Sequence, residues 1–275
     1  MMDSLGIAAV LGIVEGLTEF LPVSSTGHLI IAGHLLGFIG EKAASFEIAI
    51  QLGAILAVVF LYWQRFARLL PKRRLSSIKE QSSLDGASGL LRIGIATFPA
   101  LLVGYLARHA IKAQLFNPAA VTWALAVGGA AILLVERFRS RQVSNDVDRL
   151  TLWQAIGIGI FQILALWPGT SRAAATMIGG MIVGLDRKSA AEFSFLIAVP
   201  VLFAASGYEL VRMRDQLAMR DAAELGIGFA VSFIVALLAV KGFVRFLEHG
   251  KLTPFAWYRI IVAPVFYYLT RGINL

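Results

Sequence analysis

The sequence predicts an all-α integral membrane protein, folded as a single transmembrane domain over residues 1–275. Only 15% of the residues are charged and 58% are hydrophobic, whereas a soluble domain carries about 25% charged residues. Uncharged apolar runs recur along the chain, and most reach the roughly 17–25 residues that a membrane-spanning helix needs. A large soluble helical core is the alternative interpretation, but polar faces do not alternate with the apolar ones.

Two kinds of segment make up the predicted membrane region. Six apolar runs predict full spans, at residues 45–64, 90–108, 118–136, 190–211, 222–243 and 252–270. Two other segments, residues 5–36 and 152–184, each contain a proline followed by hydroxyl residues. After the second proline, residues 173–185 provide only 13 uncharged positions, about 20 Å of helix against a hydrocarbon core of about 30 Å. We therefore predict two re-entrant helical hairpins, which break at Pro22 and Pro168 and return to the side they entered from.

The hairpins belong to a predicted internal repeat, with one copy at residues 5–136 and the other at 150–270. The two proline motifs align at an offset of 146 residues, which pairs Ser25 with Ser171. With six spans, 16 loop lysines and arginines fall on one side and seven on the other, and the basic side is predicted to be cytoplasmic. The first hairpin then opens outside and the second inside, as an inverted repeat predicts.

The formal net charge of +8 comes mainly from basic residues between the apolar runs. Such residues act as topology signals, so the sequence predicts no nucleic-acid partner. The longest polar linker, residues 72–88, is predicted to be a cytoplasmic loop without chemistry. Arg259 lies inside the last span beside Trp257 and Tyr258, and we interpret it as an anchor at the membrane interface.

Two carboxylates in the first hairpin are the first candidates for chemistry. Glu15 and Glu19 are four residues apart, so they share one helix face within an apolar segment, where a charged group usually has a function. Two negative charges repel each other unless a cation or a proton lies between them. Oxygen ligands suit Mg²⁺ or Ca²⁺, so the pair predicts a divalent metal site. The alternative is a pair near the helix end that reaches water.

A hydroxyl cluster with a histidine follows Pro22. Because Pro22 ends the incoming helix, Ser24, Ser25 or Thr26 is expected to cap a new helix whose free N–H groups bind an anion. His28 lies three residues after Ser25 and shares its helix face. A hydroxyl, an imidazole and a carboxylate together suit nucleophilic or acid–base catalysis. Simple capping with a packed histidine is the alternative.

The second hairpin carries an arginine in an apolar sequence. The planar guanidinium of Arg172 can bind two phosphate oxygens at once. The neighbours that we predict to bind substrate with it are Gly169, Thr170, Ser171 and Thr176. A structural ion pair of Arg172 with Glu15 or Glu19 is the alternative. Taken together, the two segments suit an anionic phosphate headgroup on a lipid tail, which we expect to lie between Arg172, Ser25 and His28.

The two motifs also resemble a known family. Glu15-Gly-Leu-Thr-Glu-Phe-Leu-Pro-Val-Ser-Ser-Thr-Gly-His28 is similar to the glutamate-rich motif of the bacterial undecaprenyl-diphosphatases, also called bacitracin-resistance proteins. Pro168-Gly-Thr-Ser-Arg-Ala-Ala-Ala-Thr176 resembles their arginine-bearing motif, and the likeness covers nearly the whole chain. The family usually has serine where this chain has Ala173, so no role is assigned to that position.

The resemblance implies a phosphatase of the bacterial inner membrane, which recycles the lipid carrier for peptidoglycan synthesis and confers bacitracin resistance. It implies a divalent metal and an active site that faces the periplasm or cell exterior. Glu15 and Glu19 would serve as metal or acid–base residues, Ser25 and His28 as candidate nucleophiles, and Arg172 as the phosphate binder.

Several alternatives stay open at the level of sequence. A transporter or flippase is the competing function, because inverted repeats with broken helices also build transporters. Ser25 is favoured as nucleophile because helix N–H groups would hold the phosphate beside it, with His28 and metal-bound water as alternatives. The sequence does not decide between Mg²⁺ and Ca²⁺, or between a monomer and a homodimer.

Overall fold

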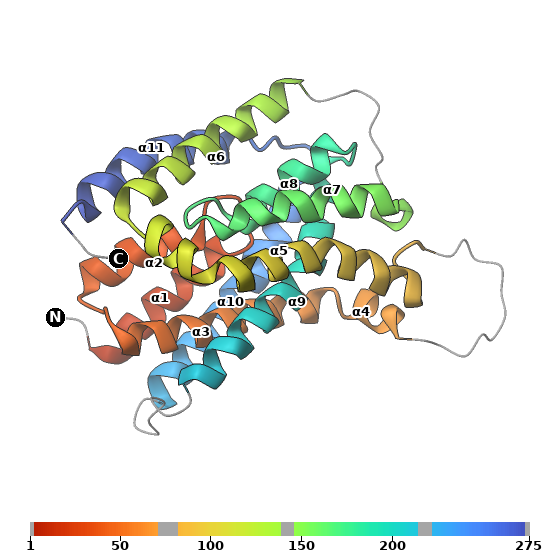
Figure 1. Cartoon of the computed structure of the whole chain (residues 1–275). Coiled ribbons are helices and arrows are strands. Elements are labelled where there is room, and N and C mark those ends of the chain that lie inside the picture. The colour runs from red at the N-terminus through yellow and green to blue at the C-terminus, as the bar shows by residue number, and fades with distance from the viewer. Residues whose placement is uncertain (1–2, 71–81, 139–145, 214–221, 273–275) are drawn as a thin grey trace.

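The computed structural model describes residues 3–70, 82–138, 146–213 and 222–272, and these residues are almost entirely helical (Figure 1). Within the described residues there is no β-strand, which confirms the predicted all-α class. The helices, in chain order, are α1 (Ser4–Thr18), α2 (Ser25–Leu36), α3 (Glu41–Leu61), α4 (Trp63–Leu69), α5 (Gly86–Leu115), α6 (Pro118–Phe138), η1 (Val147–Arg149), α7 (Leu152–Ile163), η2 (Leu164–Leu166), α8 (Arg172–Ile182), α9 (Arg187–Met213), α10 (Ala222–Leu247) and α11 (Thr253–Thr270).

Four helices, α5, α6, α9 and α10, are long and apolar enough to cross a membrane. Helices α3 and α4 together make a fifth candidate, bent by 78°. These five coincide with five of the six predicted spans, so the chain is a multi-pass membrane protein. The sixth, α11, has 18 residues but carries Arg259, and it is not among these candidates.

The two predicted hairpins are pairs of short helices. Helix α1 has 15 residues, α2 and α7 have 12 each, and α8 has 11. At about 1.5 Å per residue, even α1 is about 23 Å long, shorter than a hydrocarbon core of about 30 Å. Figure 1 shows α1 running inward from the end of the molecule where α11 finishes, and α7 running inward from the opposite end. The four arms are thus short, and the first arms start at opposite ends of the molecule, while their re-entrant course in a membrane stays a prediction.

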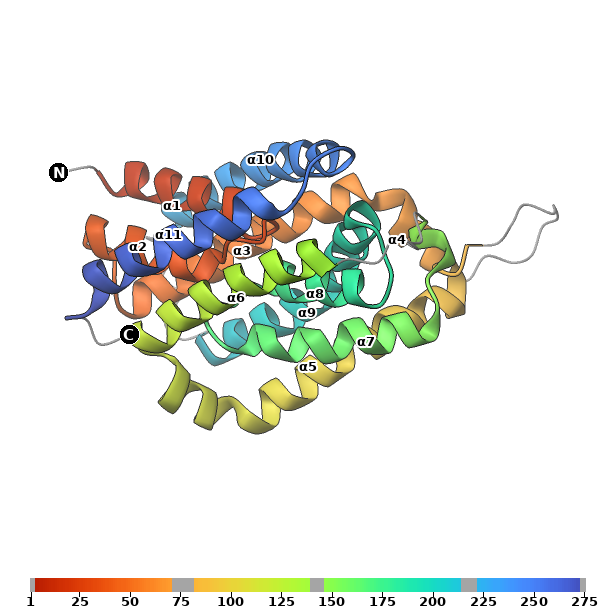
Figure 2. The ribbon, with the colours of Figure 1, turned by 90° about the horizontal axis from the view of Figure 1, so that it is seen from above.

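The first arm of each hairpin packs closely against one long helix. Helix α1 lies along α10, where a Cβ atom on Gly12 or Gly16 would come within 2.7 Å of a carbonyl oxygen of α10. Helix α7 lies beside α5 (Figure 2), where a Cβ atom on Gly159 would come within 2.9 Å of the Cα atom of Ala96. Glycine at these positions lets the backbones of the two helices come into close contact.

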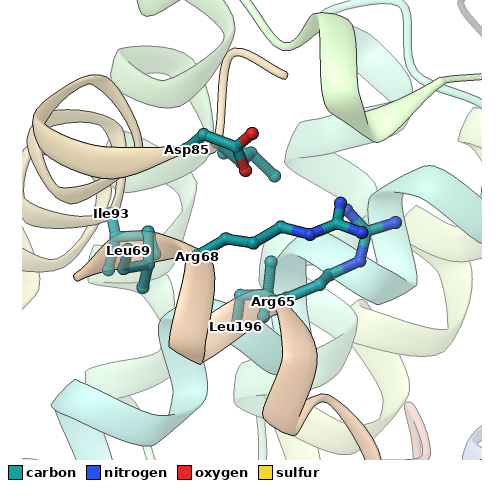
Figure 3. A pocket seen from close by; sticks show the side chains of 7 residues that line it. Arg65, Arg68, Leu69, Asp85, Ile93 and Leu196 are labelled. Carbon is teal, nitrogen blue, oxygen red and sulfur yellow. The ribbon is translucent and has the colours of Figure 1, made fainter. Parts of the chain in front are cut away.

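An ion-pair network joins the two halves of the sequence near the bend after α3. Arg65 of α4 contacts Asp148 at 2.5 Å and Glu192 of α9 at 3.3 Å. Arg65 and Arg68 also line a small cavity below Asp85, at the start of α5 (Figure 3). Burial alone would raise the pKa of Asp148, but hydrogen bonds from Ser82 and Arg65 outweigh it, and the pKa lies below its usual value.

The predicted linker at residues 72–88 is described only in its last part. Residues 72–81 lie outside the described residues, as do the basic residues of the loops at 139–145 and 214–221 that entered the charge count. Helix α5 already begins at Gly86, directly after Asp85, so the last residues of the predicted linker are helical.

Candidate active site

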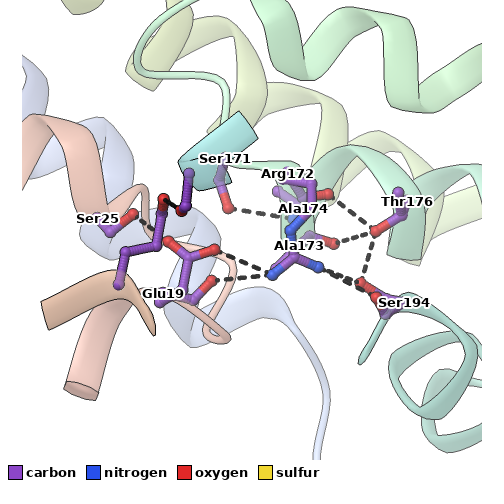
Figure 4. A network of polar contacts seen from close by, with 10 residues as sticks. Glu19, Ser25, Ser171, Arg172, Ala173, Ala174, Thr176 and Ser194 are labelled. Atoms are coloured by element: carbon purple, nitrogen blue, oxygen red, sulfur yellow. Dashed lines mark hydrogen bonds and ion pairs between the residues drawn. The ribbon is translucent and has the colours of Figure 1, made fainter. Parts of the chain in front are cut away.

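Glu19 joins the two polar segments. Its Oε2 atom accepts a hydrogen bond of 2.6 Å from the hydroxyl of Ser25, and its Oε1 atom lies 3.1 Å from Nη2 of Arg172 (Figure 4). The side chains of Arg172 and Glu19 are only 8% and 6% exposed. The two predicted segments therefore meet at one buried carboxylate, and the pairing of Arg172 with Glu19 that the sequence left as an alternative is present here.

The guanidinium of Arg172 also forms a hydrogen bond with α9. Its Nη1 atom donates to the carbonyl of Ser194 at 3.1 Å, whereas its buried Nε atom has no hydrogen-bond partner among the described residues. Thr176 is fully buried, and its hydroxyl contacts the Ser194 hydroxyl at 2.6 Å and donates to the carbonyl of Arg172 at 2.8 Å. Thr176 thus supports the arginine, and its contact with a substrate stays a prediction.

Two serines stand at the N-cap positions of the returning helices and have the same unusual backbone conformation. Ser24 has a φ angle of 76° and Ser171 one of 69°, and residues other than glycine rarely adopt such positive φ angles. Each hydroxyl accepts a hydrogen bond from the backbone three residues later, at 3.4 Å for Ser24 and 3.2 Å for Ser171. Ser25 and Arg172 are consequently the first residues of α2 and α8. The structural offset is 147 residues, so the predicted pairing of Ser25 with Ser171 is wrong by one position.

The remaining residues predicted to bind substrate lie around these helix starts. Thr26 is exposed and Thr170 is half-buried. Gly169 has a φ angle of 93°, and a Cβ atom there would lie 2.7 Å from the carbonyl oxygen of Val121 in α6. The glycine is therefore explained by the turn and by its packing on α6, and its contact with substrate stays a prediction.

His28 is held by other groups than Ser25 and Glu19. Its Nδ1 atom lies 2.7 Å from the carbonyl oxygen of Ser24, and its Nε2 atom lies 2.7 Å from the hydroxyl of Tyr258. Because a carbonyl only accepts, Nδ1 carries the proton of a neutral ring, and Nε2 accepts from Tyr258. The two rings stack with an interplanar angle of 6°. Both nitrogens of His28 are thus already occupied.

Glu15, like Nε of Arg172, lacks a hydrogen-bond partner among the described residues. It is 1% exposed, and neither carboxylate oxygen has a hydrogen-bond partner in the described part of the chain. Glu19 and Glu47 lie close enough to repel its charge, and Arg172 close enough to attract it. The described residues hold no cluster of three or more His, Cys, Asp or Glu residues that suits a metal ion. The unpartnered carboxylate fits a hard cation that completes its coordination with water or substrate oxygens.

Comparison with known proteins identifies the family. The family model described as bacitracin resistance protein BacA matches residues 8–265. The chain belongs to this family. Three relatives named undecaprenyl-diphosphatase are similar over almost their whole length. The protein of Maridesulfovibrio salexigens is 54% identical over 96% of this chain and 98% of its own. Those of Solidesulfovibrio magneticus and Nitratidesulfovibrio vulgaris are 52% and 50% identical, over 98% and 97% of this chain and 99% and 98% of their own.

Four residues of this BacA-family chain lie at the site although sequence reasoning did not predict them there: Glu47, Ser194, Tyr258 and Arg259. Glu47 and Ser194 belong to the similar stretches Ser45-Phe-Glu and Glu192-Phe-Ser, which was a usable signal. The interpretation of Arg259 as an interface anchor is wrong, because the side chain is fully buried. Its hydrogen bonds reach backbone far away in sequence, which no local pattern reveals.

Proposed function

We propose that the chain hydrolyses undecaprenyl diphosphate to undecaprenyl phosphate and inorganic phosphate. It would thereby recycle the lipid carrier of peptidoglycan synthesis and confer bacitracin resistance. The relatives named undecaprenyl-diphosphatase support this activity. The observation that carries it is the contact of one carboxylate, Glu19, with a hydroxyl on one side and a guanidinium on the other.

The first step is nucleophilic attack by Ser25. Glu19 accepts the Ser25 proton along the 2.6 Å hydrogen bond, and the alkoxide oxygen attacks the terminal phosphorus. The bond from that phosphorus to the bridging oxygen breaks, and undecaprenyl phosphate leaves with the bridging oxygen. Arg172, exchanging Glu19 for the phosphate, offers its unpartnered Nε atom and a terminal nitrogen to two phosphate oxygens.

The second step is hydrolysis of the phosphoserine. Glu19 has by then passed the first proton to the bridging oxygen of the departing undecaprenyl phosphate, so it can accept a proton from the attacking water. As water attacks the phosphorus, the bond to Ser25 Oγ breaks, and Glu19 returns this proton to Oγ. The helix N-termini that begin at Ser25 and Arg172 add partial positive charge on both sides of the phosphate. His28 is the weaker candidate nucleophile, because its ring nitrogens are engaged by Ser24 and Tyr258.

Glu15 and Glu19 are the residues that would hold Mg²⁺ or Ca²⁺. When bound, the cation would neutralise phosphate charge and polarise the phosphorus centre. The two buried and unpartnered oxygens of Glu15 support this assignment. The negative charge of Glu47 repels that of Glu15, and a bound cation would offset this repulsion.

We also propose the finer topology: six spans with α11 as the sixth, and two re-entrant hairpins in an inverted repeat. Equivalent packing supports it, since α1 packs on α10 as α7 packs on α5, and α2 contacts α11 as α8 contacts α6. The positive-inside count favours the bacterial inner membrane orientation in which the first hairpin opens to the periplasm.

Phosphate release by purified protein tests the function. In detergent, the wild type should release phosphate from a polyprenyl diphosphate and lose this activity in chelator. Arg172→Lys keeps the charge but removes the fork, so we expect kcat to fall by about 10²–10³-fold. The exposed Arg271→Lys is the matched control and should retain activity. Lipid movement across liposomes without phosphate release would contradict the proposal and favour a transporter.

Acid-quenched reactions identify the nucleophile. Acid-stable phosphoserine at Ser25, absent in Ser25→Ala, is the expected result. Acid-labile phosphohistidine at His28 would overturn the assignment of Ser25, and labelled water entering phosphate without any phosphoenzyme would indicate direct attack by water.

A further inference from the structure

Arg259 of α11 is the largest fully buried side chain outside the reactive group. It is 0% exposed, and none of the described carboxylates forms an ion pair with it. Its guanidinium donates instead to four backbone carbonyls, at 2.9–3.2 Å, which belong to Pro22, Ala124, Leu125 and Gly169. A buried charge with this many acceptors joins separate parts of the backbone.

Two of these carbonyls occupy equivalent places in the two hairpins. Pro22 is two residues before Ser24, and Gly169 is two residues before Ser171. Both lie in the non-helical tips, where a carbonyl at membrane depth needs a donor from the protein. In the described part of the chain, no other hydrogen bond to either oxygen is present. One guanidinium therefore connects the tip before Ser25 to the tip before Arg172.

Helix α6 is shaped to receive this guanidinium. A Cβ atom on Gly128 would overlap Nη2 of Arg259, so only glycine leaves the space. The carbonyls of Ala124 and Leu125, one turn earlier on α6, fix the plane of the fork. A lysine ammonium is a single point with three donors and cannot reproduce this planar arrangement.

We propose that Arg259 is a positioning residue, which ties both hairpin tips to α6 and so sets the distance between Ser25 and Arg172. Among the described residues, Arg259 itself forms no hydrogen bond with Ser25 or Glu19. The expected effect of Arg259 on the rate of phosphate release rests on the proposed phosphatase function. The expected effect on the distance between the two hairpins is independent of that function.

Distance measurements between the hairpins test the tie directly. The chain has no cysteine, so spin labels can be placed at Leu35→Cys at the end of α2 and Ile182→Cys at the end of α8, both exposed. The label distance should be narrowly distributed in the parent and broadened in Arg259→Lys, Arg259→Met and Gly128→Ala. Gly242→Ala in α10 is the matched control, because a methyl group there meets open space.

Kinetics of the same variants complete the test. Misplacement of about 1 Å is expected to lower kcat about 10²-fold in Arg259→Lys, with KM changed much less. Unchanged label distances together with wild-type kcat per folded molecule would overturn the proposal, even if Tm falls. Gly128→Ala keeps the arginine and provides the test if Arg259→Met does not fold. A wild type that releases no phosphate would refute the proposed function, and the label distances would still decide the role of Arg259.

Discussion

The hairpins α1–α2 and α7–α8 have the same backbone conformation at their turns but carry different charged side chains. In each, a serine with a positive φ angle caps the returning helix, and the next residue, Ser25 or Arg172, begins it. The first hairpin adds the carboxylates of Glu15 and Glu19, whereas the second contributes the guanidinium. The same turn thus places the hydroxyl of Ser25 in the first hairpin and the guanidinium of Arg172 in the second. This difference between the two copies creates the site.

The first arms of the two hairpins carry different side chains at the position of Glu15. At the structural offset of 147 residues, Glu15 corresponds to Gln162, and both are almost completely buried. The amide nitrogen of Gln162 donates to the carbonyl of Ala96 at 2.9 Å. Its Oε1 atom lacks a partner among the described residues, whereas in Glu15 both oxygens lack one. A neutral amide at this position donates to the neighbouring helix, whereas the carboxylate of Glu15 is the group on which the proposed cation site rests.

The largest effect should come from removing the carboxylate that both hairpins share. Glu19→Gln keeps the shape but loses the base for Ser25 and the charge opposite Arg172, so kcat for phosphate release should fall about 10³-fold. Glu248→Gln, in an exposed ion pair with Lys188, is the control and should retain its rate. Near-normal turnover by Glu19→Gln would show that the first hairpin does not supply the base.

A smaller effect is expected from Tyr258→Phe, which frees Nε2 of His28. Loss of one hydrogen bond should lower kcat about two- to tenfold, because His28 is held by Tyr258 and the proposed nucleophile is Ser25. Diethyl pyrocarbonate labelling of His28 should rise relative to the exposed His109 and His249. An increase in rate, accompanied by phosphohistidine, would instead mean that Tyr258 restrains a reactive histidine.

The shared turn can be tested through stability. Ser24→Ala and Ser171→Ala each lose the cap but keep the strained φ angle, so each should reduce the free energy of unfolding by about 1–2 kcal/mol. The corresponding glycine variants relieve the strain and should lose much less. Denaturant titration in detergent measures this. Different responses at the two serines would show that the hairpins do not share one turn.

The smallest effect concerns the network that joins the halves away from the site. Since the pKa of Asp148 is lowered in the folded protein, its contribution to stability is present at neutral pH and disappears as pH falls below about 4. Asp148→Asn should therefore reduce Tm at neutral pH, and its difference from wild type should shrink in acid. A difference that persists unchanged at low pH would mean that ionisation of Asp148 is not its origin.

The sequence was sufficient for the all-α class and for the two polar segments that meet, because both depend on local pattern, whereas the catalytic roles of their residues stay predictions. Uncharged runs revealed the long helices, and buried charges beside Pro22 and Pro168 revealed the two segments that meet at Glu19. The offset was misjudged by one residue, since identity of residue type aligned Ser25 with Ser171 while backbone conformation aligns Ser24 with it. Arg259 was misinterpreted as an interface anchor because its partners are backbone carbonyl groups, which every residue has.

The close contact of α1 with α10 widens the set of positions at which sequence change is costly. Gly12 and Gly16 touch no reactive group, yet a single added methyl at either would press on a carbonyl of α10. Glu15 and Glu19 are on the same helix or at its end, so they would shift with it. Mutational tolerance should therefore be as low along this glycine face as at the carboxylates, and a map of intolerant positions would outline a helix contact as well as a catalytic centre.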